Sequence, residues 1–239
     1  MTYINAKSKY LINVKNIKVK HKFDTLVTKS VNITEDQIEE CKKYAEKYIE
    51  ESKNYKALVP SSIKDEKIQK EVAKQLVFAN KIGECAVLNY FKYRGLKSDV
   101  LKDNKIDIRT YIDKDIHNRL IINKKDFESK NKNEYYIGAH LNLEVEDKKH
   151  PIKKYLVKGI YDIKRVQLYG YLEAKFIESL RYEVINKKNG KKEHKFYTKK
   201  ASNYDKKDKY DNFGFDCKWY YLDRMLEIEG LVMKIKNSL

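Results

Sequence analysis

Three acidic residues within a short stretch of the chain have the types and spacing of a metal site. Glu84 follows Gly83 in an apolar helical segment, and Asp99 and Asp107 lie in the two short segments that come next. Carboxylate oxygens are the ligands that Mg²⁺ prefers in proteins. An ion held by them stabilises charge on a scissile phosphate and lowers the pKa of an attacking water. The pattern therefore predicts a Mg²⁺ or Mn²⁺ site formed by Glu84, Asp99 and Asp107.

A cation adjoins the last of these acids. Residues i and i+2 of a strand share a face, so Asp107 and Arg109 are expected to point the same way in a strand over 106–112. A turn over 102–105 would fold a preceding strand back alongside it and bring Asp99 toward Asp107. The guanidinium of Arg109 would then contact the phosphate or the developing oxyanion.

Two helices are expected to position these residues. Thr34 and Gln37 have the capping-box pattern, which predicts a helix from there to about residue 53. A second helix is predicted over about 67–94, and Gly95 is expected to end it. Both segments carry apolar residues at three- and four-residue spacing, which is typical of a helix with one buried face.

Short strands and turns are expected around the helices. One or two strands are predicted within 9–31, a helix is predicted after Gly170, and a final helix is predicted over 217–236. Turns rich in Asp, Asn and Lys separate the remaining predicted strands, which cover 98–101, 106–112, 118–122, 134–145 and 153–170. This pattern indicates an α/β (α+β) protein with a mixed central sheet.

The most basic part of the chain follows residue 180. A hairpin with a type I′ turn is predicted over 184–196, around Asn189-Gly190. Lysines alternate here with tyrosines, which suits a track along a phosphate backbone with rings that stack on bases, although a solvated loop has the same composition. The candidate nucleic-acid contacts are Lys187, Lys188, Lys191, Lys192, Lys199, Lys200, Lys206 and Lys207.

The charge of the whole chain favours a polyanionic partner. The 239 residues carry a formal net charge of +17, which points to nucleic acid first and to an anionic membrane surface second. Codon bias in an AT-rich genome would also enrich lysine over arginine. The chain has neither a signal-like N-terminus nor an apolar run long enough to cross a bilayer, so a cytoplasmic protein without membrane contact is expected.

Other chemistries find no support in the sequence. Cys41, Cys85 and Cys217 are widely spaced without a CxxC pair, and the histidines lack metal-ligand spacing, so neither a disulfide framework nor a zinc site is predicted. The motifs GxxxxGK[ST], GxGxxG, GxSxG and HExxH do not occur. Common nucleotide hydrolases, dinucleotide enzymes, esterases and zinc proteases are therefore disfavoured.

The order of these elements resembles the PD-(D/E)xK nuclease superfamily. More narrowly, the chain is similar to phage and prokaryotic members with a GE helix and a D…(D/E)xK hairpin. The resemblance spans about 33–180 and is carried by the first helix, Pro60-Ser61-Ser62-Ile63, Ile82-Gly83-Glu84-Cys85-Ala86-Val87, Ser98-Asp99-Val100 and Ile106-Asp107-Ile108-Arg109-Thr110. It implies a restriction-endonuclease-like αβββαβ core and Mg²⁺-dependent phosphodiester hydrolysis.

The resemblance also assigns roles to residues. Glu84 would be the helix carboxylate near the metal, Asp99 the first strand carboxylate, and Asp107 the D/E position. Arg109 would occupy the lysine position, which is a departure from the family pattern. A guanidinium stays protonated, so Arg109 cannot act as a general base, although it can neutralise charge.

A literal match to the family motif lies further along the chain. Asp162 precedes the sequence Glu173-Ala174-Lys175. The helical spacing predicted after Gly170 would make Glu173 and Lys175 diverge, so this set is kept as the alternative site.

The chain is expected to form one domain over 1–239. It would comprise N-terminal strands and helices over 1–95, a catalytic sheet over 96–180 and a basic hairpin with a C-terminal helix over 181–239. Three functions are compatible with these observations. The leading hypothesis is a metal-dependent DNA endonuclease. The second is a non-catalytic nucleic-acid-binding protein on a degenerate nuclease fold, and the third is a protein–protein interaction or inhibitor module. RNA as the ligand and a homodimer are left open.

Overall fold

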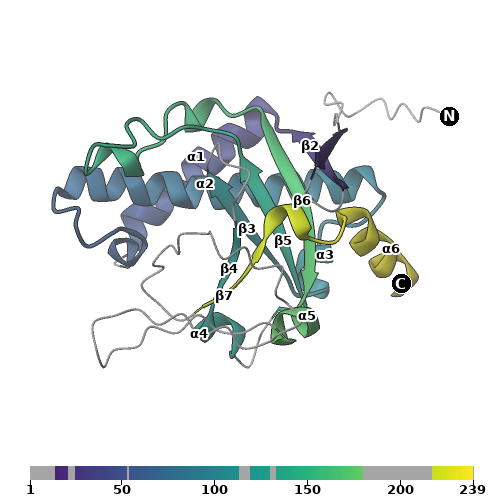
Figure 1. Cartoon of the computed structure of the whole chain (residues 1–239). Coiled ribbons are helices and arrows are strands. Elements are labelled where there is room, and N and C mark those ends of the chain that lie inside the picture. The colour runs from purple at the N-terminus through teal and green to yellow at the C-terminus, as the bar shows by residue number, and fades with distance from the viewer. Residues whose placement is uncertain are drawn as a thin grey trace, which may run out of the picture.

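Five strands form a mixed sheet at the centre of the structure (Figure 1). The computed structural model describes residues 14–20, 25–52, 54–112, 119–129, 133–179 and 217–238. The strands are β1 (Val14–Lys20), β2 (Thr25–Asn32), β3 (Ile106–Ile112), β5 (Tyr135–Leu141) and β6 (Arg165–Glu173). Their order is β1-β2-β6-β5-β3, and neighbours are antiparallel except for β3 and β5, which are parallel.

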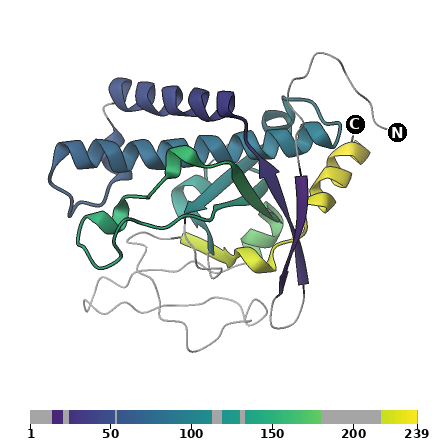
Figure 2. The ribbon, with the colours of Figure 1, turned by 90° about the horizontal axis from the view of Figure 1, so that it is seen from above.

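Two helices, α1 (Glu35–Glu51) and α2 (Glu66–Tyr93), form a layer on one face of this sheet (Figure 2). The capping box is confirmed, because the Thr34 hydroxyl accepts from the Gln37 amide and the Gln37 side chain accepts from the Thr34 amide. Gly95 follows α2 with φ of +79°, a left-handed conformation that ends a helix readily only at glycine. Apolar residues of both helices and the sheet form the main core, including Ile38, Phe78, Ile82, Ile137 and Leu168.

A second, smaller sheet lies against the other face. It consists of β4 (Arg119–Asn123) and β7 (Cys217–Tyr221), which pair antiparallel. In the chain, β4 is followed by the short helix α4 (Lys124–Phe127), and β7 is followed by the 3-10 turn η4 (Leu222–Arg224). A second apolar core joins the two sheets and includes Leu120, Phe127, Tyr136, Leu172 and Met225.

Short elements complete the described chain. They are the 3-10 turns η1 (Tyr55–Leu58), η2 (Lys153–Tyr155) and η3 (Ile160–Asp162), and the helices α3 (Val100–Asp103), α5 (Ala174–Ser179) and α6 (Ile228–Ser238). In the described residues, no helix combines the length and apolar composition that crossing a bilayer requires.

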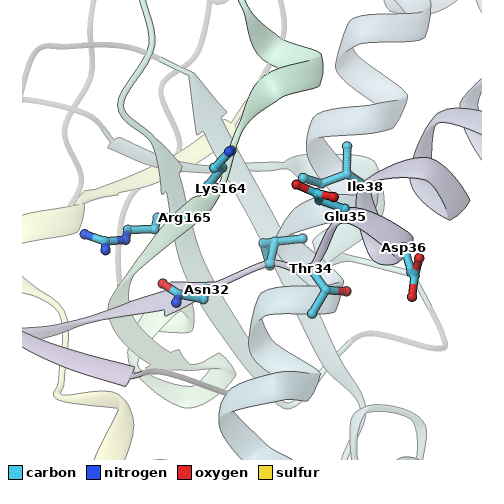
Figure 3. A pocket seen from close by; sticks show the side chains of 8 residues that line it. Asn32, Thr34, Glu35, Asp36, Ile38, Lys164 and Arg165 are labelled. Atoms are coloured by element: carbon cyan, nitrogen blue, oxygen red, sulfur yellow. The ribbon is translucent and has the colours of Figure 1, made fainter. Parts of the chain in front are cut away.

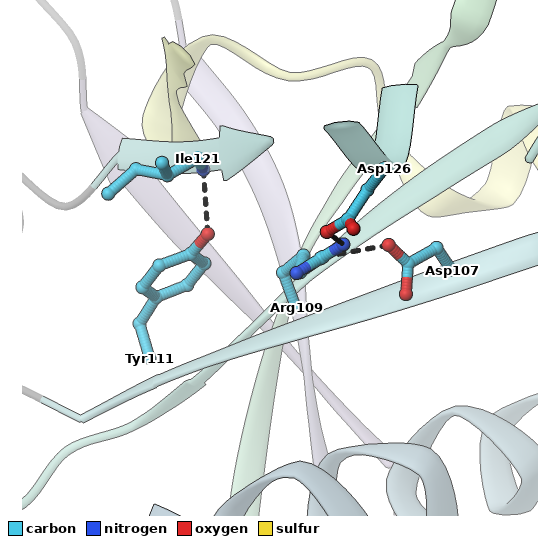
Figure 4. A network of polar contacts seen from close by, with 5 residues as sticks. All are labelled: Asp107, Arg109, Tyr111, Ile121 and Asp126. Carbon is cyan, nitrogen blue, oxygen red and sulfur yellow. Dashed lines mark hydrogen bonds and ion pairs between the residues drawn. The ribbon is translucent and has the colours of Figure 1, made fainter. Parts of the chain in front are cut away.

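The side chains of β3 divide between the two faces of the sheet. Gly83 of α2 lies so close to Thr110 that a Cβ on Gly83 would overlap the Thr110 hydroxyl oxygen. Thr110 therefore faces α2, and alternation along the strand directs Asp107, Arg109 and Tyr111 to the opposite face. Figure 4 shows these three side chains directed away from the helical layer.

The predicted mixed sheet flanked by helices is confirmed as a mixed α/β architecture, and the strand over 106–112 is confirmed residue for residue. The strand predicted over 98–101 is wrong. Backbone amides of Lys102 and Asp103 bond to the Asp99 carbonyl and form the single turn of α3, while Val100 is buried. The Asp99 segment therefore does not form a hairpin with β3.

Other boundaries differ from the predictions, and the strand predicted over 134–145 ends at Leu141. The region 153–170 contains η2 and η3 before β6 begins, and the helix predicted after Gly170 begins only at Ala174. The first part of the predicted final helix is the strand β7, because Trp219 pairs with Ile121 of β4. The hairpin predicted over 184–196 lies outside the described residues.

The contact between Gly83 and Thr110 gives a stability prediction. Gly83→Ala should lower the free energy of unfolding by about 1–3 kcal/mol, because a methyl group there forces α2 away from the short, branched Thr110 side chain. Gly230→Ala in α6 is the matched control, since its Cβ would only reach ordinary contact with Tyr171. Denaturant unfolding measures both, and equal effects of the two substitutions would contradict the proposed contact.

Candidate functional site

Asp107 and Arg109 meet on the face of β3 that lies opposite α2. The Nε of Arg109 donates to Oδ2 of Asp107 at 2.7 Å (Figure 4). The expectation that these two residues share a strand face is confirmed.

A third residue, Asp126 of α4, completes the cluster. The Nη2 of Arg109 donates to Oδ2 of Asp126 at 3.3 Å, so one guanidinium bridges two carboxylates (Figure 4). Phe127, next in the chain, is buried in the second core and anchors α4 there. The sequence does not predict a role for Asp126, because its position depends on how β4 packs against β3, which no local pattern records.

Tyr111 links the two sheets beside this cluster. Its hydroxyl accepts a hydrogen bond of 2.7 Å from the backbone amide of Ile121 in β4 (Figure 4). The rise of a strand places Tyr111 about 7 Å from Arg109 on the same face. This bond therefore helps to hold β4, and with it Asp126, above Arg109.

Burial controls the electrostatics of the cluster. The side chains of Asp107, Arg109 and Asp126 are 22%, 32% and 56% exposed. Burial raises the pKa of Asp107, and the nearby Arg109 offsets this only in part. For Arg109, burial tends to lower the pKa, but the two carboxylates outweigh it and keep the guanidinium charged.

Tyr136 lies next to Asp107 in the adjacent strand. The two residues are paired in the register of β3 and β5, and Tyr136 is almost fully buried. Burial first and the charge of Asp107 second raise the pKa of its phenol to about 12. Tyr136 is therefore protonated at neutral pH and can act as a hydrogen-bond donor toward the cluster.

The structure does not bring together the three predicted metal ligands. Glu84 pairs with Lys81 at 2.6 Å on α2, on the far side of the sheet from Asp107. Asp99 is exposed at the start of α3, where the Ser98 hydroxyl contacts it. Within the described residues, no three His, Cys, Asp or Glu side chains are arranged to hold a metal ion.

The two carboxylates that do meet also fit a metal poorly as they stand. Arg109 already contacts one oxygen of Asp107 and one of Asp126, and it lies between them. A Mg²⁺ or Mn²⁺ ion at that position would compete with a fixed positive charge. The described residues therefore do not form the predicted Mg²⁺ site.

The alternative site is not assembled either. Asp162 precedes β6, whereas Glu173 is its last residue, and a strand of nine residues spans roughly 30 Å. Glu173 forms an ion pair with Lys234 of α6, and Lys175 is exposed on α5. The expected divergence of Glu173 and Lys175 arises from a strand-to-helix junction instead of a continuous helix.

The predicted lysine contacts cannot be placed. Lys187, Lys188, Lys191, Lys192, Lys199, Lys200, Lys206 and Lys207 lie outside the described residues.

A pocket of about 600 Å³ lies where β2 ends, α1 begins and β6 begins (Figure 3). Lys164 and Arg165 line one side, and the acids Glu35 and Asp36 of the first turn of α1 line another. Thr34 also lines it, but the capping box already engages its side chain. The pocket is of mixed charge and contains none of the catalytic, metal-binding or nucleic-acid-binding residues that the sequence predicts.

The chain has no match among protein-family models, curated proteins or solved structures.

The burial of Asp107 predicts a specific pH dependence. An acid whose pKa is raised in the folded state binds more protons there than in the unfolded chain, so its contribution makes stability fall as pH rises through the acid range. Asp107→Asn removes this contribution. The stability of wild type relative to Asp107→Asn should therefore be greatest at low pH, decrease as pH rises above about 4, and become constant near neutrality.

Urea unfolding at a series of pH values measures this difference. Asp103→Asn, which replaces an exposed carboxylate on α3, gives the baseline for losing one acid. A relative stability that rises with pH would show that the ion pair with Arg109 outweighs burial.

Proposed function

We propose that the protein binds nucleic acid on a nuclease-like core in which an arginine takes the place of the metal. The observation that carries the proposal is the bridge from Arg109 to both Asp107 and Asp126. A restriction-endonuclease-like fold is part of this proposal and is supported by the mixed sheet, the long α2 and the position of Asp107 on β3.

The bridge supports binding more than cleavage. Arg109 neutralises the carboxylates that a divalent cation would need, and it cannot accept a proton from an attacking water. The net charge of +17 supplies long-range attraction to a polyanion. The same residues therefore favour a site that holds phosphate without hydrolysing it.

Arg109 has a group left for such a contact. Its Nε and Nη2 bond to the two carboxylates, while Nη1 has no hydrogen bond within the described part of the chain. About a third of the side chain is exposed. A guanidinium that is held in place on one side is well suited to donate to a phosphate oxygen on the other.

Metal-dependent DNA cleavage is the competing proposal. The observation that favours it is the presence of Asp126, which supplies a second carboxylate beside Asp107. In that case the ion would have to displace Arg109 from between the two acids. DNA is the expected partner in both proposals, and the lysines of 187–207 would add contacts to the backbone in both.

The binding proposal predicts the effect of removing one positive charge. Arg109→Gln should weaken binding to a DNA duplex by about three- to tenfold and reduce the slope of log affinity against log salt by about one, because one phosphate contact is lost. Arg94→Gln is the matched control, since it removes the same charge from an ion pair with Glu229. Fluorescence anisotropy at several salt concentrations measures both, with folding checked by circular dichroism.

Equal losses in the two variants would refute a local role for Arg109. Binding that is absent or insensitive to salt would instead favour the protein–protein interaction module.

Catalysis is tested with supercoiled plasmid. The protein should retain DNA in EDTA and leave the plasmid intact with Mg²⁺ or Mn²⁺. Nicking that requires metal and disappears in Asp107→Ala would overturn the binding proposal and support the nuclease. Nicking that survives in Asp107→Ala would favour the alternative set Asp162, Glu173 and Lys175.

A further inference from the structure

Two cysteines from different helices lie side by side between α1 and α2. The Sγ atoms of Cys41 and Cys85 are 3.6 Å apart, although the residues are 44 positions apart in the chain. Cys41 is 2% exposed, and Cys85 is half-buried. Cys85 is therefore the more exposed of the two residues.

A positive charge is held beside this pair. Lys81 lies one helical turn before Cys85 on α2 and forms an ion pair with Glu84 at 2.6 Å. Its ammonium also lies over the ring of Tyr44, 5.0 Å from the ring centre, and Tyr44 belongs to α1. These contacts keep Lys81 at the junction of the two helices.

The electrostatics of the two thiols differ. The hydrogen bond between the two thiols and the charge of Lys81 lower the pKa of Cys85, against the effect of burial. The pKa of Cys41 is raised, first by its hydrogen bond to Cys85 and then by burial. Cys85 is thus the better nucleophile, and Cys41 is placed to attack it in a second step.

The distance between the sulfur atoms is compatible with bond formation. A disulfide bond is about 2.05 Å long, so the two sulfur atoms must approach by about 1.5 Å. Closing this gap requires a change in the cysteine side-chain torsion angles or a small shift of α1 against α2. The packing of α1 on α2 already holds both residues in the main core or against it.

We propose that Cys41 and Cys85 form a reversible disulfide that cross-links α1 to α2. The oxidant is a small disulfide such as oxidised glutathione. The Cys85 thiolate attacks one of its sulfur atoms, the S–S bond breaks, and one glutathione thiolate leaves. Cys41 then loses its proton and attacks the Cys85 sulfur, which releases the second glutathione. Two electrons pass from the protein dithiol to the reagent, and two thiols are formed.

The test uses the wild-type chain over residues 1–239 under native conditions. The protein is incubated with oxidised glutathione, free thiols are alkylated, and peptides are mapped by mass spectrometry without reduction. The expected result is one cross-linked pair containing Cys41 and Cys85, with Cys217 recovered in alkylated form. Dithiothreitol should return all three thiols to the alkylated pool.

Two variants define the order of the steps. Cys41→Ser should stop at a mixed disulfide of glutathione with Cys85, while Cys217→Ser should give the same cross-link as wild type. Wild-type protein that accumulates glutathione on Cys85 without a cross-link, or that pairs either residue with Cys217, overturns the proposal. Three fully alkylated thiols after incubation also overturn it. The readout needs neither DNA nor metal, so it is independent of the proposed function.

Discussion

The close approach of α2 to β3 at Gly83 determines which side of the sheet each candidate residue occupies. A residue with a side chain at this position would hold the helix away from the strand. With glycine, Thr110 turns toward the helix, and the alternation of the strand sends Asp107 and Arg109 to the other face. The helix that carries Glu84 is consequently on the wrong side for Glu84 to join Asp107. The packing of α2 on β3, to which Ile106, Ile108 and Ile112 also contribute, thus places Glu84 and Asp107 on opposite sides of the sheet.

On the face of the sheet away from α2, ion pairing compensates for the burial of charged side chains. A buried carboxylate alone would be costly, and burial raises the pKa of Asp107 although the nearby Arg109 lowers it. Arg109 offsets this cost by forming ion pairs with Asp107 and Asp126. Asp126 is kept in position because Phe127, the next residue, is buried in the second core. The cluster is therefore partly a structural device that allows polar groups between two sheets. Its remaining exposed surface is where a phosphate contact is proposed.

The sequence predicts those features that local chemistry determines. The capping box at Thr34, the end of α2 at Gly95 and the shared face of Asp107 and Arg109 are each encoded within a few residues, and the structure has all three. Features that depend on distant pairing were not predicted. The apolar spacing around Trp219 predicts a helix, but Trp219 lies in a strand because β4 pairs with it. Tertiary packing brings Asp126 to Arg109 and Cys41 to Cys85.

The pairing of β4 with β7 also bears on when the Arg109 cluster can form. The two strands are separated by about a hundred residues, and closing so long a loop is slow relative to forming α1 and α2. The chain can therefore assemble the helices and the central sheet while the second face of that sheet is still uncovered. During synthesis, Arg109 would leave the ribosome long before β7 arrives to hold β4 in place. The Asp107–Arg109 pair lies within β3 and needs no other element, so it is the bridge to Asp126 that depends on the late pairing of β4 with β7.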